Sequence, residues 1–480
     1  MSLRKKAILW INLLLTGCMV GPDYRRPETN LPASWSGTAA NIAATEADMA
    51  QWWRIFNDPL LSNLIEQAKT GNRDLYQAQA RLHEARARRR LADANLLPTS
   101  SMELSASQTG SSKQAGFSAG STGIGVSSEL YSHGIDASWE LDLFGKLRRN
   151  IESAEAGEQA AREDLRDVLV SLCAEVALNY VELRGYQTRL AITENTLASQ
   201  SETYDITRWR GMAGLTTQLD VDQAKLTMEN TRANLPNLRS SIKQSKHSLA
   251  LLLGLQPVDL DTQLAASAPI PAATGRVAVG IPADMLRQRP DVRRAERQLA
   301  AQTAQIGVAE AARYPDFTLS GSIGLESLAY ANLYSASAKA FQMAAKAALV
   351  LLDGGRISAN VDIQNALTEQ ALGLYEATLL AALRDVENAL TAYEEEIKRR
   401  DSLESAVAAG ISALALAQTQ YTSGISDFQR VLEAQRSLLS VQLQLAISQA
   451  EVASNVIRLY KALGGGWDIE KNKQETGHEH

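Results

Sequence analysis

The stretch Ile135-Asp136-Ala137-Ser138-Trp139-Glu140-Leu141-Asp142-Leu143 alternates apolar and polar side chains without a break. Strict alternation of this length predicts a β-strand with two different faces. Residues 317 to 326 alternate nearly as regularly, and residues 102 to 107 give a shorter example. Such strands suit an outer-membrane barrel, where one face meets lipid and the other meets the lumen. A half-buried sheet in a water-soluble protein has the same periodicity, so the pattern alone leaves both interpretations open.

Long segments free of proline follow these strands. Residues 148 to 208 carry apolar side chains at three- and four-residue spacing, and residues 356 to 421 do so again. Because proline breaks helix interiors, these are the places where long helices can run. Each helix would be about 90 Å long at 1.5 Å per residue, a length typical of coiled-coil-like or repeat architectures.

A second helix is predicted to return alongside each long one. The returns fall at residues 215 to 254 and 425 to 463, and each follows a glycine, Gly214 or Gly424. Glycine adopts the backbone conformation that ends a helix in a tight turn. The pattern therefore predicts two antiparallel helical hairpins.

The chain is duplicated. Asp74 and Pro98 have the same separation in sequence as Asp291 and Pro315. Each half predicts the order helix, strand, loop, strand, long helix, turn and helix, and internal repeats of this kind point to quasi-symmetric assembly. We predict a first repeat at residues 48–270, a second repeat at 271–467 and a flexible C-terminal tail at 468–480.

Two strands in each half give four per chain. Single-chain outer-membrane barrels begin at about eight strands, and lipid does not tolerate the open edges of a four-stranded sheet. If the barrel interpretation holds, several chains must close the barrel together.

The N-terminus predicts export. Three basic residues and the short apolar run 7 to 15 resemble a secretory signal peptide at residues 1–17. The sequence Leu15-Thr16-Gly17-Cys18 fits a bacterial lipobox, in which Cys18 carries acyl groups such as palmitate and becomes the mature N-terminus. Residues 18–47 would then form a lipidated, extended tail. The alternative is an ordinary cleaved signal with an incidental cysteine.

Composition and motifs exclude several function classes. The net charge is −6 and the basic residues form no large cluster, which argues against nucleic-acid binding. No phosphate-binding loop, nucleophile elbow or zinc-protease motif is present, so we expect no enzyme, no cofactor and no metal centre. With Cys18 lipidated, Cys173 has no partner for an intrachain disulfide, and its apolar neighbours predict a buried side chain.

The chain resembles the TolC-type outer-membrane factors, in particular the lipoprotein branch associated with resistance–nodulation–division (RND) efflux pumps. The resemblance extends from Cys18 to about Trp467 and rests on several short motifs in this order: Gly21-Pro22-Asp23-Tyr24, Trp52-Trp53, Trp139-Glu140-Leu141-Asp142-Leu143-Phe144-Gly145, Leu219-Asp220-Val221, Arg289-Pro290-Asp291-Val292-Arg293, Asp353-Gly354-Gly355-Arg356, Ala434-Gln435-Arg436 and Leu463-Gly464-Gly465-Gly466-Trp467.

This resemblance implies an α+β membrane protein that forms a homotrimer. Four strands per chain would form a 12-stranded outer-membrane β-barrel, continued by a long α-helical barrel in the periplasm. It further implies a lipid-anchored channel in the cell outer membrane that contacts membrane lipid. The channel would passively conduct substrates from an inner-membrane RND pump and a periplasmic adaptor, the membrane fusion protein.

The resemblance also implies a gate where the helical hairpins turn, at residues 214 to 225 and 424 to 436. Three copies of one carboxylate would form a ring whose mutual repulsion favours pairing with arginine or a raised pKa. The family often has leucine and aspartate where this chain has Gln429 and Glu433. The alternative is that these are solvated tip residues without a gating role. The candidate gate residues are Asp220, Asp222, Gln429, Arg430, Glu433 and Arg436.

Two other functions remain open at this stage. The channel could serve a type I protein secretion system, although the lipobox and the Gly21-Pro22-Asp23-Tyr24 motif favour the efflux branch. A periplasmic coiled-coil scaffold lipoprotein would explain the helices and the anchor but not the alternating strands. The sequence names neither the substrate nor the pump.

Overall fold

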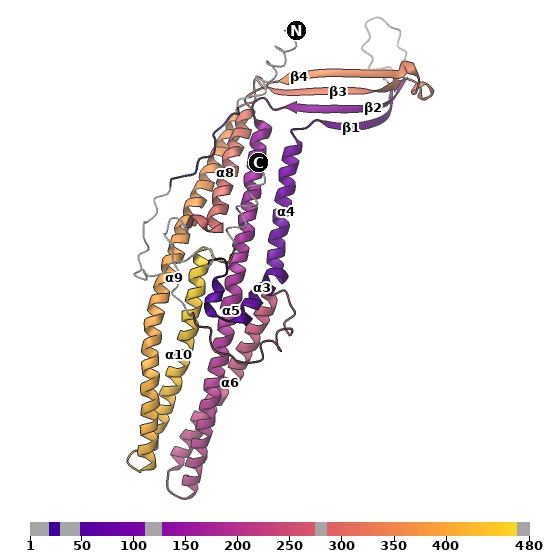
Figure 1. Cartoon of the computed structure of the whole chain (residues 1–480). Helices are drawn as coiled ribbons and strands as arrows, with labels where there is room; N and C mark the ends of the chain where they lie inside the picture. The colour runs from indigo at the N-terminus through magenta and orange to yellow at the C-terminus, as the bar shows by residue number, and fades with distance from the viewer. Residues whose placement is uncertain (1–18, 29–48, 111–126, 274–285, 468–480) are drawn as a thin grey trace. The chain divides into compact units, whose positions relative to one another are not determined.

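The computed structural model describes residues 19–28, 49–110, 127–273 and 286–467 (Figure 1). The predicted signal peptide, Cys18, most of the N-terminal tail and the C-terminal tail lie outside these residues. In chain order the elements are the 3-10 helix η1 (Trp52–Phe56), α3 (Pro59–Gly71), α4 (Arg73–Ala94), β1 (Thr99–Gly110), β2 (Ser127–Leu141), α5 (Lys146–Met212), α6 (Gln218–Leu252), α8 (Pro290–Ala311), β3 (Asp316–Ser327), the 3-10 helices η2 (Tyr330–Asn332) and η3 (Ala336–Ala338), β4 (Lys339–Ala348), α9 (Arg356–Thr422) and α10 (Phe428–Ala462).

The predicted duplication is confirmed element by element. The long helices α5 and α9 contain 67 residues each, and the return helices α6 and α10 contain 35 each. Helices α4 and α8, which precede the strands of each half, contain 22 residues each. Both halves therefore fold into the same order of helix, two strands, long helix, turn and helix.

Glycine makes both hairpin turns, as predicted. Gly214 and Gly424 each have φ +72°, a left-handed conformation that glycine adopts without a steric penalty. The next amide in each copy bonds back to the end of the long helix, from Leu215 to the Arg210 carbonyl at 2.8 Å and from Ile425 to the Gln420 carbonyl at 2.9 Å. This is the Schellman geometry that ends helices.

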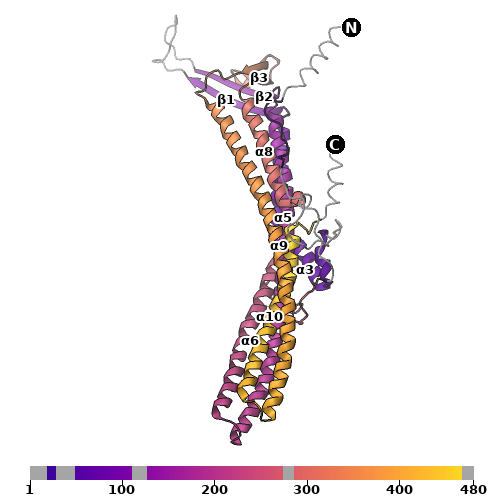
Figure 2. The same ribbon diagram turned by 90° about the vertical axis from the view of Figure 1, so that its left-hand side faces the viewer.

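The four strands form one antiparallel sheet in the order β1-β2-β3-β4 (Figures 1 and 2). The register places Met102, Ile135, Ile323 and Phe341 in one row across the sheet. Because side chains alternate along a strand, this row belongs to a single face. The face is apolar, yet Ile323 is 67% and Phe341 82% exposed in the single chain.

The opposite face of the sheet is polar. The neighbouring row across it consists of Ser101, Asp136, Ser322 and Gln342. Strands β1 and β4 form its two edges. The sheet thus has the two unlike faces that the alternation predicts.

The structure adds two features to the sequence expectations. The fourth strand, β4 (KAFQMAAKAA), was expected only from the count of two strands per half, because its alanines blur the alternation. Pro236 lies inside α6, although proline usually interrupts a helix.

The chain divides into two compact units that cut across the two repeats. One contains residues 1–27, 82–161 and 295–375, and includes the sheet. The other contains residues 28–81, 162–294 and 376–480, and includes both hairpin turns. In the second unit α5 runs beside α6, and α9 beside α10 (Figures 1 and 2).

Aromatic and small side chains fill the core of the second unit. The Trp52 ring stacks on the Tyr460 ring with 5.5 Å between centroids, and Trp53 is 1% exposed. Cys173 is fully buried, as predicted, and burial raises the pKa of its thiol to about 12. Such a thiol is inert near neutral pH.

Among the helices that the structure describes, none combines the length and the apolar character needed to cross a membrane.

Candidate functional site

The predicted gate residues all lie in the first turns of α6 and α10, directly after the two hairpin turns. In Figure 1 both turns are at the lower end of the drawing. These residues take three different roles: capping of a helix, exposure on one helix face, and a link between helices.

Asp220 caps α6. Its carboxylate accepts hydrogen bonds from the Thr217 backbone N–H at 3.1 Å and from the hydroxyls of Thr216 and Thr217 at 2.7 Å each. The Thr217 hydroxyl in turn accepts from the Asp220 amide at 3.2 Å. This reciprocal arrangement is a capping box, which satisfies amides that the first helical turn leaves unpaired.

These bonds determine the pKa of Asp220. Partial burial raises it, but the hydrogen bonds from Thr216 and Thr217 outweigh burial, so the pKa lies below its usual value. The capping bonds therefore contribute stability above the unfolded pKa of about 3.9. That contribution is lost as the pH falls through the lowered pKa of the folded state.

Asp222, Gln429, Arg430 and Glu433 are exposed. Gln429 and Glu433 are four residues apart on α10 and so share one helix face. Within the described residues, Asp222 has a hydrogen bond from Gln218 at 3.1 Å and none of the four side chains forms an ion pair. In the single chain the predicted pairing of carboxylate and arginine is thus absent from these positions.

Arg436 links α10 to α6. Its guanidinium donates to the Thr227 hydroxyl at 2.7 Å. One residue earlier, the Gln435 side-chain amide donates to the Thr203 hydroxyl of α5 at 3.1 Å. Hence polar contacts join α10 to both helices of the other hairpin.

An apolar cluster lies directly beneath the exposed face of α10. The Tyr421 ring lies 5.2 Å from the Phe428 ring, and the Arg210 guanidinium lies 4.9 Å from the Tyr421 ring centroid. The cluster comprises Ala224, Phe428, Val431 and Leu432 with Tyr204, Leu414, Ala417 and Tyr421 packed against it.

Sequence reasoning missed the residues that begin the two return helices. The Thr217 hydroxyl caps α6, and the Asp427 carboxylate caps α10 by accepting from the Arg430 amide at 3.3 Å. Both residues follow their turn glycine by three positions. Threonine and aspartate are both preferred capping residues. Their matching positions in the two repeats could therefore have indicated where each return helix begins.

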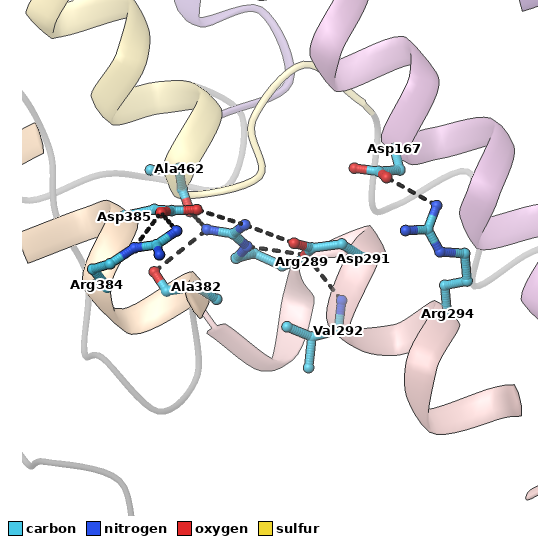
Figure 3. Close-up of polar contacts among 9 residues, drawn as sticks. All are labelled: Asp167, Arg289, Asp291, Val292, Arg294, Ala382, Arg384, Asp385 and Ala462. Carbon is cyan, nitrogen blue, oxygen red and sulfur yellow. Dashed lines mark hydrogen bonds and ion pairs between the residues drawn. The ribbon is translucent and has the colours of Figure 1, made fainter. Parts of the chain in front are cut away.

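A second polar cluster surrounds Arg289 in the same unit (Figure 3). The Arg289 guanidinium donates to the Ala462 carbonyl at 2.6 Å and, more weakly, to the Ala382 carbonyl at 3.5 Å. It also bonds both oxygens of Asp291 at 3.0 and 2.7 Å. A cation on the last carbonyls of α10 is favoured by the helix dipole, so this motif clamps the end of α10 to α9 and α8.

Arg294 lies between two carboxylates of α5. It contacts Asp164 at 2.8 Å and Asp167 at 3.0 Å. Burial raises the pKa of Asp167 above its usual value; Asp291 raises it further, while Arg294 opposes the change. A cavity of about 390 Å³ adjoins Asp167, Arg289 and Asp385. In the sequence, the motif from Arg289 to Arg293 marks the duplication and the family resemblance, but its contacts with α5, α9 and α10 were not predicted.

The two halves of the chain match a known protein family. Residues 64–255 and 281–465 correspond to the family described as outer membrane efflux protein. The chain belongs to the outer membrane efflux protein family. Its resemblance to the TolC-type factors is confirmed, and so is the expectation that it is a channel protein rather than an enzyme.

Full-length relatives support this membership. This outer membrane efflux protein is 37% identical to nodulation protein T of Rhizobium leguminosarum bv. trifolii, with 96% of this chain and 97% of that protein covered. It is 32% identical to the toluene efflux pump outer membrane protein TtgI of Pseudomonas putida, with 96% and 98% covered. The solved structure of the outer-membrane channel OprN matches with a TM-score of 0.87 at 36% identity, covering 94% of this chain and 100% of that chain.

Proposed function

We propose that this outer membrane efflux protein is one subunit of a homotrimeric, lipid-anchored channel in a tripartite efflux system. The channel passively conducts substrates that an inner-membrane RND pump and a periplasmic adaptor deliver, and it releases them outside the cell. The relatives named for efflux pumps and the resemblance to the lipoprotein branch support this assignment.

The observation that carries the proposal is the sheet. Its apolar face is exposed in the single chain, and the described charges on that face, Glu129 and Lys339, lie near the loop ends of their strands. Lipid tolerates charge near its interfaces far better than at the centre of the hydrocarbon layer. An apolar surface bordered by charge at one end is the pattern expected of a surface that contacts membrane lipid.

The open edges support an oligomer. Edge strands β1 and β4 carry backbone groups that need partners, and within lipid only a closed barrel supplies them. The outer edge of β4 in one chain can pair with β1 of the next. The resemblance to TolC-type factors supports three copies, which gives a barrel of twelve strands.

The anchor is assigned to Cys18. The lipobox supports it, and Met19, the next residue, packs closely against Gly145. Several acyl groups on one cysteine would give a stable attachment to the membrane, whereas a single acyl group gives only marginal membrane affinity.

The native mass of the detergent-extracted protein tests this function, together with its conductance in a planar bilayer. A trimer that conducts, weakly in its closed state, is the expected result. A monomer or dimer without conductance would contradict the channel and would make the scaffold lipoprotein the better account.

We further propose that the exposed face of α10 and the start of α6 line the closed entrance. The double variant Asp222→Ala with Glu433→Ala is expected to raise the resting conductance severalfold, since it removes polar side chains from the constriction in every subunit. Arg436→Ala should act in the same direction, because it releases the link from α10 to Thr227.

The matched control is Glu229→Ala, which removes an exposed carboxylate of α6 that pairs with Arg232 instead. Its resting conductance should equal that of the unmodified channel. Unchanged conductance in the double variant would mean that these carboxylates are solvated tip residues.

We assign the chain no substrate selection of its own. The relatives are named for different roles, nodulation in one case and toluene efflux in another. A passive channel is compatible with these different roles, because the pump selects the substrates that enter it.

A further inference from the structure

The first described residues form a strap, residues 19–26, along α5 and α8 in the unit that contains the sheet. The Val20 amide donates to the Phe144 carbonyl at 3.2 Å. Arg149 of α5 donates to the Val20 carbonyl at 3.0 Å, to the Gly21 carbonyl at 3.1 Å and to the Asp23 carboxylate at 2.8 Å. One guanidinium thus holds two consecutive backbone carbonyls and one side chain of the strap.

This contact is buried and tightly fitted. The Arg149 side chain is 1% exposed, which is rare for arginine unless all its donors are paired. Gly21, at φ +86°, packs so closely on α8 that a Cβ there would lie 2.4 Å from the Gly307 Cα. A Cβ on Gly307 would lie 2.8 Å from the Arg149 Cγ. We call Arg149, Gly21 and Gly307 the clasp.

A second contact holds the other end of the strap to α8. Glu296 accepts from Arg26 at 2.7 Å and from the Tyr24 hydroxyl at 3.4 Å. The Arg297 guanidinium lies 5.4 Å from the Tyr24 ring centroid. The strap therefore joins α5 of the first repeat to α8 of the second.

The duplication shows that the clasp is not a general requirement of the fold. Gly145, before α5, has the Met19 side chain 2.4 Å from where its Cβ would be, whereas its counterpart Gly355, before α9, meets nothing within 4 Å. Arg149 itself corresponds to Ala359. The arginine occurs only in the copy that meets the strap.

We propose that Arg149 is the positioning residue of the N-terminal anchor, an inference that rests on the proposed lipidation of Cys18. Met19 is seated against Gly145 and is joined to Cys18 by a single peptide bond. The clasp thus leaves almost no slack between the acylated cysteine and the folded body. It holds the anchor at the junction between the helices and the sheet, where the chain must meet the membrane.

Hydrogen exchange of the full-length protein, followed by mass spectrometry, tests the clasp. Arg149→Gln is expected to raise exchange at least tenfold in the peptide covering the strap, because its carbonyls lose their charged donor. The control is Arg148→Gln, since the described contacts of the neighbouring Arg148 side chain are all to Asp142. Strap exchange in that control should match the unmodified protein.

A second pair of variants tests the packing without removing a charge. Gly307→Ala should also release the strap, because its new methyl group displaces Arg149. Gly157→Ala should not, since a Cβ at that helical glycine meets nothing within 4 Å. For both Arg149→Gln and Gly307→Ala, less heat-resistant oligomer should be recovered from the outer membrane than for the unmodified protein.

The outcomes separate the clasp from the anchor. The mass of the N-terminal peptide reports whether Cys18 is acylated, independently of strap exchange. Unchanged strap exchange in both Arg149→Gln and Gly307→Ala would overturn the clasp. So would an equal rise in exchange along α6 and α10, because Arg149 would then stabilise the whole chain instead of positioning its N-terminus.

Discussion

Ile323→Lys is expected to abolish the heat-resistant oligomer and the conductance of the channel. Ile323 lies near the middle of β3 on the apolar face, in the row that also contains Met102, Ile135 and Phe341. A lysine on the lipid face costs up to about 2–4 kcal/mol per chain, and an oligomer incurs that cost in every subunit. Gel migration with and without heating measures the result.

The matched control is the adjacent residue. Ser322→Lys introduces the same charge one position earlier, on the polar face beside Asp136, so the oligomer should persist. Equal tolerance of both substitutions would contradict the assignment of the two faces. Loss of the oligomer only in Ser322→Lys would reverse it.

Arg289→Ala is expected to lower the unfolding free energy by about 3 kcal/mol, as breaking a buried charge pair does. The Arg289 side chain is 10% exposed, and its removal leaves Asp291 and the last carbonyl of α10 without their donor. Thermal unfolding followed by circular dichroism measures the change, which corresponds to roughly 6–12 °C for a unit of this size.

Arg384→Ala serves as the control for this effect. Arg384 lies in the same cluster (Figure 3) but is 67% exposed, and among the described residues its ion pair is with Asp385. Exposed pairs contribute about 1 kcal/mol or less, so its unfolding temperature should hardly change. Similar losses in the two variants would mean that Arg289 does not clamp the end of α10.

The long helices, the hairpin turns and two of the strands could be predicted from the sequence, because each depends on the preferences of residues close together in the chain. The absence of proline and the apolar spacing located α5 and α9 to within a few residues of their ends. Gly214 and Gly424 located both turns, since only glycine takes that backbone conformation without a penalty. Strands β2 and β3 followed from alternation alone.

Features that depend on contacts between distant parts of the chain could not be predicted from the sequence. Alanine at five of the ten positions of β4 removes the contrast between faces, and only the pairing with β3 defines that strand. The predicted return helix at residues 215 to 254 did include Pro236, which lies within α6 because packing outweighs its helix-breaking tendency. Arg149 bonds the strap and Arg289 bonds Ala462, in each case across more than a hundred sequence positions. Periodicity does not reveal such contacts.

The candidate site was predicted in position but not in detail. Its location followed from the two turns, and the shared helix face of Gln429 and Glu433 followed from their spacing. Asp220 proved to be part of a capping box, because Thr217, the capping residue, precedes it by three positions. Arg436 bonds Thr227 rather than a carboxylate, a choice that depends on how α6 and α10 pack.

The equal lengths of the paired helices restrict how this chain can change in evolution. From β1 to β3 the repeats are offset by 217 positions, but from α5 to α9 by 210, so the net difference in length between these parts of the two repeats arises between the first strand and the long helix. Deleting one residue within α5 would rotate all later side chains by about 100° relative to α9. Strand ends and their connections can therefore lengthen or shorten, whereas the helices can change only by substitution.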